Sequence, residues 1–316
     1  MNDELVPESG ILAEGQLSAE PLVDAKPRRV RIIGVASGSG ARDHGCQDGP
    51  DELRSLGIFR SLQGADDRLC WDQTINPPGP ATGPLDTVAQ ISEVLAKAVR
   101  GTLAEGNFPL VVGGDHSCAI GTWSGVHAHV ATTGRLGLLW IDAHMDSHTF
   151  RTSPSKAIHG MPLACLLGFG HYRLTRVMSD SPKILPQDLC LIGVRSFESG
   201  EAALLRRLGV RVYFMKDVKK RGLQEVLREA VAYISKETVG YGISFDIDAL
   251  DPVEEPGVGS PVPDGLLESD LSSALKSIHS DKKLLALEIV EYNPHHDRNH
   301  ATAEAVRDLC GSILGE

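Results

Sequence analysis

Acidic and imidazole side chains follow three apolar runs of this sequence at short, regular spacing. The side chains are Asp142, His144 and Asp146 in DAHMD, His116 in GGDHS, and Asp246 and Asp248 in DID. Residues at positions i, i+2 and i+4 of an extended segment share one face. We therefore expect the alternating residues of DAHMD to point the same way, and those of DID to do likewise, toward one crevice.

A crevice with this many carboxylates needs compensating positive charge. Each unpaired buried charge costs on the order of several kcal/mol, even after its surroundings relax. The three motifs contain no Lys or Arg, but mixed carboxylate and imidazole ligands suit divalent ions such as Mn²⁺. Carboxylates that bridge two ions about 3.5–4 Å apart form a two-metal hydrolytic site. Taken singly, each motif also fits a solvated strand end, a turn or a helix N-cap at Ser117, but three together favour the metal site.

Short apolar runs alternate with amphipathic segments from residue 29 onward. The expected strands are 30–35, 109–114, 136–142, 189–194, 210–214, 241–248 and 284–290. The expected helices are about 84–105, 117–130, 158–168, 200–208, 222–237, 267–280 and 301–314. This order predicts an α/β fold with a parallel sheet covered on both faces. In such sheets, sites form beyond the carboxyl ends of the strands, where the three motifs lie.

The composition restricts the partners and the compartment. A formal net charge of −11 and a pI of about 5.5 disfavour nucleic acid and anionic membranes and weakly favour a cationic small molecule. No apolar stretch reaches the roughly 18–20 residues that span a bilayer, and the acidic N-terminus lacks the features of a signal peptide. The six cysteines show no CxxC spacing, so we expect free thiols in the cytoplasm. Residues 1–28 are expected to be a flexible tail.

The segments GGDHS, DAHMD and SFDIDALDP resemble the three metal-binding signatures of the arginase/ureohydrolase family. They occur in the family order, and the resemblance extends from about Val30 to the C-terminus, closest to the bacterial-type arginases. It implies a single catalytic domain at 29–316, with three α-β-α layers around a mainly parallel eight-stranded sheet. It also implies two Mn²⁺ ions per subunit, cleavage of a guanidine or related amidine C–N bond, and a homo-oligomer, either a trimer or a hexamer.

The resemblance also assigns roles to individual residues. One ion would be held by His116, Asp142, Asp146 and Asp246, and the other by His144, Asp142, Asp246 and Asp248. A hydroxide bridging the two ions would attack the guanidinium carbon, and Asp146 would help to move the proton. His159, in IHGMP, matches a proton shuttle or general acid, and Glu291, in EYNP, matches a carboxylate that orients the guanidinium. Read alone, His159 is an ordinary helix-start histidine and Glu291 an ordinary strand-end carboxylate.

Substrate choice is expected to lie in the loop 147–160. By position, Ser153 and Ser155 match hydroxyl residues with which arginases read the amino-acid end of arginine. His148 replaces the Asn usual there, and Glu198 lies where arginases usually carry an Asp. Ser260 matches a hydroxyl near the metal ligands. Since Ser and Thr are common in loops, plain loop composition is the alternative interpretation.

The loop length and EYNP favour hydrolysis of L-arginine to L-ornithine and urea. The departures at His148 and Glu198 leave open an agmatinase, a guanidinobutyrase or a formimidoylglutamase. Two other classes of protein are alternatives to a ureohydrolase. A zinc-dependent deacetylase on a related fold would not need His116 and Asp248 as ligands. A non-catalytic metal-binding homologue would be expected to have lost ligands.

Two other stretches are interpreted as loops. Residues 34–45, GVASGSGARDHG, depart from a dinucleotide-binding fingerprint because Asp43 stands where the third glycine is needed, so we expect a loop at the rim of the site. Residues 293–300, NPHHDRNH, contain three histidines. A solvated loop leading into the last helix is expected there rather than a second metal site.

Overall fold

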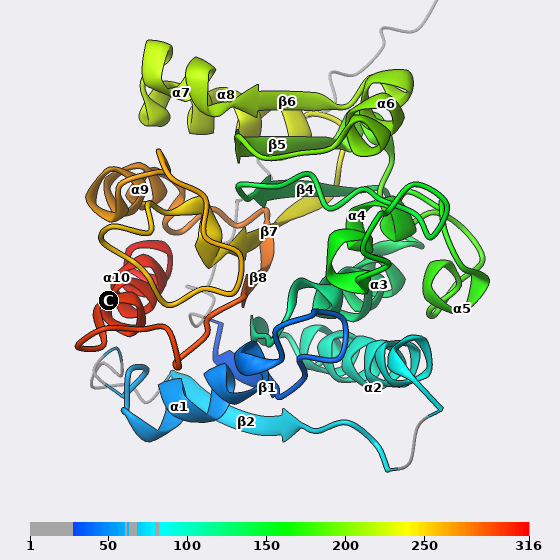
Figure 1. Cartoon of the computed structure of the whole chain (residues 1–316), viewed down its shortest axis with the longest axis horizontal. Helices are drawn as coiled ribbons and strands as arrows, with labels where there is room; N and C mark the ends of the chain where they lie inside the picture. The colour runs from blue at the N-terminus through cyan, green and yellow to red at the C-terminus, as the bar shows by residue number, and fades with distance from the viewer. Residues whose placement is uncertain (1–27, 61, 63–67, 80–81, 316) are drawn as a thin grey trace, which may run out of the picture.

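One parallel sheet forms the centre of the computed structural model, which describes residues 28–60, 62, 68–79 and 82–315. Its eight strands lie in the order β2-β1-β3-β8-β7-β4-β5-β6 (Figure 1). They are β1 (Val30–Val35), β2 (Leu69–Ile75), β3 (Phe108–Val112), β4 (Leu136–Ile141), β5 (Leu189–Val194), β6 (Arg211–Phe214), β7 (Gly240–Asp246) and β8 (Leu284–Val290). All neighbouring strands pair in parallel. The predicted α/β class and eight-stranded parallel sheet are confirmed; the predicted tail, apart from Arg28, lies outside the described residues.

Helices cover both faces of the sheet, as Figure 1 shows. One face packs against α1 (Gly49–Ser55), α7 (Met215–Arg221), α8 (Leu223–Ile234), α9 (Glu268–Leu275) and α10 (Ala301–Leu314). The other packs against α2 (Pro84–Ala104), α3 (Ala119–Val130), α4 (Pro162–Leu166) and α6 (Ser199–Leu208). A further short helix, α5 (Tyr172–Thr175), follows α4. Because apolar side chains leave both faces of the central strands, every residue of β3, β4, β5 and β7 is buried.

The seven expected strands are all present, with small shifts at their ends. The eighth, β2, was not expected, because Asp72 and Gln73 interrupt its apolar residues. It is an edge strand paired only with β1, so much of its surface faces solvent. The expected helix at 158–168 is divided into a 3-10 turn, η3 (Ile158–Gly160), and α4. This division places His159 in a turn rather than inside a helix.

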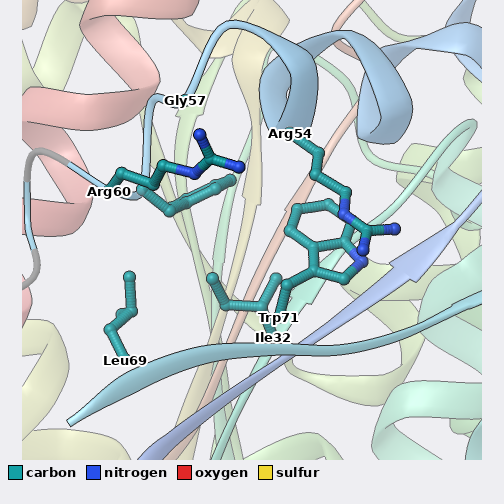
Figure 2. A pocket seen from close by; sticks show the side chains of 7 residues that line it. Ile32, Arg54, Gly57, Arg60, Leu69 and Trp71 are labelled. Atoms are coloured by element: carbon teal, nitrogen blue, oxygen red, sulfur yellow. The ribbon is translucent and has the colours of Figure 1, made fainter. Parts of the chain in front are cut away.

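A small cavity of about 150 Å³ lies between the α1 region and strands β1 and β2 (Figure 2). The Arg54 guanidinium lies over the Trp71 ring, 5.4 Å from its centroid, and Ile32 and Leu69 line the cavity beside them. None of its lining residues belongs to the three motifs. This cavity is therefore not the predicted site.

Two general expectations can be compared with the fold. All six cysteines are described, and all are free thiols, as predicted. Among the described residues, no helix combines the length and apolar character needed to cross a bilayer.

Candidate metal centre and substrate pocket

The side chains of the three motifs converge at the carboxyl ends of β3, β4 and β7. His116 opens a 3-10 turn, η2 (His116–Cys118), which begins a few residues after the end of β3. Its Nδ1 atom lies 3.4 Å from Asp142 Oδ2, 3.1 Å from Asp146 Oδ2 and 3.0 Å from Asp246 Oδ2. These four residues offer ligand atoms that all lie within 4.8 Å of one another. They are the same four that the resemblance assigns to one ion.

A second group of ligand atoms adjoins the first. His144 Nδ1 lies 3.0 Å from Asp248 Oδ2 and 3.5 Å from Asp142 Oδ1, and these three residues also offer atoms within 4.8 Å of one another. Asp142 belongs to both groups, as a bridging ligand would. Asp246 belongs here only to the first group, whereas the resemblance places it in both. The floor cluster, as it is called below, comprises His116, Asp142, His144, Asp146, Asp246 and Asp248.

The backbone that carries DAHMD is not a continued strand. β4 ends at Ile141, and Asp146 adopts a left-handed conformation with φ of 43°. Asp248 lies in a 3-10 turn, η5 (Ile247–Ala249). Asp246 caps this turn, because its Oδ1 accepts the Asp248 N–H at 2.8 Å. The expectation of an extended alternation is therefore wrong. The side chains converge because tight turns at the strand ends fold them over the sheet edge.

Buried neighbours fix the His116 ring and one of its carboxylate partners. The Trp140 indole stacks on the His116 ring with centroids 4.1 Å apart and planes 8° apart, and its Nε1–H donates to Asp142 Oδ2 at 2.8 Å. His116 Nε2 lies 3.0 Å from Ser244 Oγ, which donates to Glu288 Oε2 at 2.6 Å. Such contacts leave Nδ1 of His116 directed at the carboxylates. The sequence analysis missed these supports, although Trp140 stands two residues before Asp142.

The electrostatics of the floor cluster favour bound cations. Burial raises the pKa of Asp246 well above its usual value, and repulsion by Asp248 and Asp142 raises it further. Burial and repulsion by Asp142 likewise raise the pKa of Asp146 to about 6. Two imidazoles thus supply too little positive charge for four buried carboxylates. The donor set, with hard oxygens and borderline nitrogens, fits a pair of divalent metal ions.

His159, which is partly buried, and Glu291, which is buried, form a pair beside the floor cluster. His159 Nδ1 lies 3.0 Å from Glu291 Oε1, and the same oxygen accepts the His116 backbone N–H at 2.9 Å. Burial raises the pKa of Glu291, but the neighbouring His159, the His116 N–H and the Cys46 thiol outweigh it and hold that pKa at about 2. Burial lowers the pKa of His159, but Glu291 and more distant carboxylates outweigh it and raise that pKa to about 9. The pair is therefore ionised near neutral pH.

Four polar residues form the outer end of the pocket, here called the outer cluster: His148, Ser153, Ser155 and Glu198. His148 Nε2 lies 2.8 Å from Glu198 Oε2, and its Nδ1 lies 3.1 Å from Thr152 Oγ1. The Ser153 and Ser155 hydroxyls lie 3.2 Å apart. Hydrogen bonding by His148 lowers the pKa of Glu198, whose side chain is 61% exposed. The outer cluster thus pairs its polar groups with one another.

Glu201 is a buried carboxylate that the sequence analysis did not single out. Its side chain closes a capping box at the start of α6, accepting the Glu198 N–H at 3.0 Å and the Ser147 N–H at 3.3 Å. Burial raises the pKa of Glu201 to about 8. The spacing of Glu198 and Glu201 in ESGE is the sequence signal that would have revealed this cap.

A pocket of about 150 Å³ connects the two clusters. It is lined by side chains of the floor cluster, by His159 and Glu291, by all four outer-cluster residues and by Ser260. Every predicted catalytic and substrate-contacting residue therefore faces one cavity. The fold and site define an α/β protein in which two adjacent metal-ligand groups open into a small polar pocket.

Comparisons with known proteins identify the family. The family model described as Arginase family matches residues 28–315. The arginase of Bacillus caldovelox is 40% identical over 300 residues, covering 91% of this chain and 98% of that protein. The arginase of Brevibacillus brevis is 38% identical, covering 92% and 98%. A crystal structure of Bacillus subtilis arginase superposes with a TM-score of 0.86 at 34% identity, covering 92% and 99%.

The chain belongs to the arginase family and is a metal-dependent ureohydrolase. This membership confirms the resemblance drawn from the three motifs. It also sets aside the deacetylase alternative, because both metal-ligand groups are present.

Proposed function

We propose that this ureohydrolase converts L-arginine and water into L-ornithine and urea, with two Mn²⁺ ions in each subunit. The observation that carries the proposal is the single pocket that joins the floor cluster and Glu291 to the polar outer cluster. Such a pocket offers charged or polar partners to both ends of a guanidino amino acid. The arginases of Bacillus caldovelox and Brevibacillus brevis, which match most of this chain, support the same substrate by their names.

The floor cluster would hold the metal ions. His116, Asp142, Asp146 and Asp246 would bind one ion, and His144, Asp142, Asp246 and Asp248 the other. When bound, such a pair lowers the pKa of a coordinated water and stabilises negative charge that develops on the substrate. Trp140, Ser244 and Glu288 hold the His116 ring in the orientation that ligation requires.

The reacting group would be oriented by Glu291 and protonated with the help of His159. Glu291 stays anionic because of its low pKa, so its carboxylate can accept N–H donors of a planar guanidinium. His159 is protonated near neutral pH and can donate a proton to the departing amine as the C–N bond breaks. Asp146 would accept a proton from the attacking water.

The outer cluster would bind the amino-acid end of the substrate. The Ser153 and Ser155 hydroxyls can donate to a carboxylate, whereas Glu198 can accept from an ammonium group. The ring nitrogens of His148 lie against Glu198 and Thr152, so His148 would offer a donor to the carboxylate by exchanging one of these contacts. Ser260 lines the pocket and would act as a further hydroxyl partner. Agmatine lacks the carboxylate and 4-guanidinobutyrate lacks the ammonium group, so each would leave part of this cluster without a partner.

We further propose that residues 29–316 form one catalytic domain and that subunits assemble as a trimer or hexamer. Light scattering coupled to gel filtration measures the assembly directly. A monomer that retains full turnover would contradict the proposed assembly without affecting the proposed reaction.

The experiment that tests the reaction is a parallel assay of purified, Mn²⁺-loaded protein. L-arginine, agmatine and 4-guanidinobutyrate are assayed for urea, and formiminoglutamate for ammonia and formamide. We expect kcat/KM to be highest for L-arginine. Preference for another compound would retain the metal chemistry and overturn the proposed reading of the outer cluster. No turnover of any substrate by protein with two bound metals would favour a non-catalytic homologue.

A further inference from the structure

The loop between β1 and η1 (residues 36–44) reaches the side of the pocket where His159 and Glu291 lie. The Gly40 carbonyl accepts the backbone N–H groups of Ile158 at 2.7 Å and of His159 at 3.1 Å. The Gly40 N–H in turn donates to Asp115 Oδ2 at 2.8 Å. A Cβ at residue 40 would lie 2.5 Å from Asp115 Oδ1, so glycine is needed for this close approach. The loop therefore holds the turn that carries His159.

The same segment contacts Glu291 through Cys46, in the 3-10 turn η1 (Gly45–Asp48). Cys46 is fully buried, and its Sγ atom lies 3.1 Å from Glu291 Oε2. Burial and the adjacent Glu291 raise the pKa of the thiol far above its usual value. The thiol thus stays protonated and donates to the carboxylate. Glu291 Oε1 already contacts His159 and the His116 N–H, so both carboxylate oxygens are fixed.

The position of Cys46 is itself closely constrained. Asn293, two residues after Glu291 and fully buried, donates from Nδ2 to Asp43 Oδ2 at 3.1 Å. A Cβ at Gly45 would lie 2.5 Å from the Asn293 amide. The turn that carries Cys46 is thus packed directly against the segment that carries Glu291. Small movements of the thiol relative to the carboxylate are disfavoured on both sides.

We propose that Cys46 is a positioning residue for Glu291, which rests on the role proposed above for that carboxylate. The thiol holds Oε2, and thereby the plane of the carboxylate, so that an incoming guanidinium meets an acceptor that is already oriented. A thiol is a weak donor, so it restrains the carboxylate while leaving most of its charge to the substrate. The competing interpretation is that Cys46 only fills space.

Three variants separate positioning from packing. Cys46→Val keeps a side chain of similar size without a donor, Cys46→Ser keeps a donor, and Cys190→Val makes the same change at a buried thiol in β5, away from the pocket. We expect Cys46→Val to lower kcat/KM by about 5- to 20-fold. This is the range for losing a hydrogen bond to a charged group, reduced because a thiol is a poor donor. The loss should fall mainly on KM, with bound metal unchanged. Cys46→Ser should recover most of it, and Cys190→Val should match the wild type.

Wild-type kinetics in Cys46→Val would overturn the proposal. An equal loss of kcat/KM in Cys46→Ser and Cys46→Val, accompanied by lowered thermal stability in both, would also overturn it.

An infrared measurement of the S–H stretch provides a test that needs no turnover. The difference spectrum between wild type and Cys46→Val isolates this thiol. We expect a band shifted to low frequency by the charged acceptor, which moves back toward the free-thiol position in Glu291→Gln. A free-thiol band in the wild type would overturn the proposal even if arginine is hydrolysed, whereas a shifted band in a protein inert toward guanidines would overturn only the proposed function.

Discussion

The floor cluster and the outer cluster line the same pocket but are built differently. Floor residues lie at or shortly after the carboxyl ends of strands β3, β4 and β7, and most are fully or almost fully buried. Outer residues lie on the loop after β4 and before α6, where Glu198 is 61% exposed. Carboxylates are forced together in the floor cluster, whereas the outer cluster pairs an imidazole with a carboxylate and one hydroxyl with another. The floor is therefore organised to receive cations, and the outer end is organised to exchange its own hydrogen bonds for those of a ligand.

The largest expected effect is in the floor cluster. Asp246→Asn removes a proposed ligand, and loss of several kcal/mol of transition-state stabilisation would lower kcat/KM by about 1000-fold or more. Without metal, the variant should be at least as stable as the wild type, because one of four mutually repelling carboxylates is gone. Metal content by mass spectrometry and melting temperature with and without Mn²⁺ check both statements.

Asp188→Asn is the matched control for that variant. Asp188 is also a buried carboxylate, but it pairs with Arg135 at 2.8 Å and lies outside the pocket. Its substitution should lower stability with and without Mn²⁺ and leave the metal-dependent rise in melting temperature intact. An Asp246→Asn protein that behaves like this control would show that the floor cluster does not hold the metal.

A second large effect is expected where the floor cluster meets the guanidinium. Glu291→Gln and His159→Ala should each lower kcat/KM for arginine by about 100-fold, the range for loss of a charged orienting group or a general acid. Metal content should stay near the wild-type value. Steady-state kinetics with metal analysis check this, and wild-type urea release by both variants would contradict the proposed roles.

The His159–Glu291 pair also predicts a change in the pH profile. Glu291 raises the pKa of His159 to about 9, so an imidazolium needed as proton donor is present below that pH and lost above it. Removing the negative charge in Glu291→Gln lowers the pKa of His159. The fall of kcat at alkaline pH should therefore occur at lower pH in this variant. If it occurs at the same pH as in the wild type, a group other than His159 causes it.

Smaller, substrate-dependent effects are expected in the outer cluster. Because the His148–Glu198 contact is partly exposed, its intrinsic strength is about 0–1 kcal/mol. His148→Asn and Glu198→Gln should change KM for arginine by less than about tenfold and leave kcat within a few-fold. The ratio of kcat/KM for arginine to that for agmatine should change more than either value. Equal losses for both substrates would show that these residues do not read the amino-acid end.

The two clusters also differ in how far the sequence predicts them. The floor residues could be found because strands such as β4 are continuous apolar runs, and a polar residue such as Asp142 directly after one must lie at the sheet edge. The left-handed turn at Asp146 could not be found, because nothing in DAHMD announces a positive φ. Cys46 and Glu288 were missed for another reason: their partners, Glu291 and Ser244, are distant in the sequence. Contacts of this kind depend on the packing of separate elements, not on local pattern.

The smallest expected effect concerns backbone strain, which occurs in both the floor cluster and the outer loop. Asp146 in the floor cluster, with φ of 43°, and Lys156 in the outer loop, with φ of 62°, are both left-handed. The left-handed conformation destabilises the folded state by about 1–2 kcal/mol at a non-glycine residue. Glycine removes this strain, but it also increases the conformational entropy of the unfolded chain, which costs about 0.5–1 kcal/mol of stability. Lys156→Gly should therefore stabilise the protein by roughly 0.5 kcal/mol, a rise of about 1–2 °C in melting temperature, with unchanged turnover.

Lys156→Ala is the control, because it loses the Lys156 Nζ contact to the Phe150 carbonyl at 2.6 Å but keeps the strained backbone. If Lys156→Gly is no more stable than Lys156→Ala, the strain is relieved elsewhere in the loop. At Asp146 the same relief would remove a proposed metal ligand, so there the strained conformation is retained with the side chain that needs it.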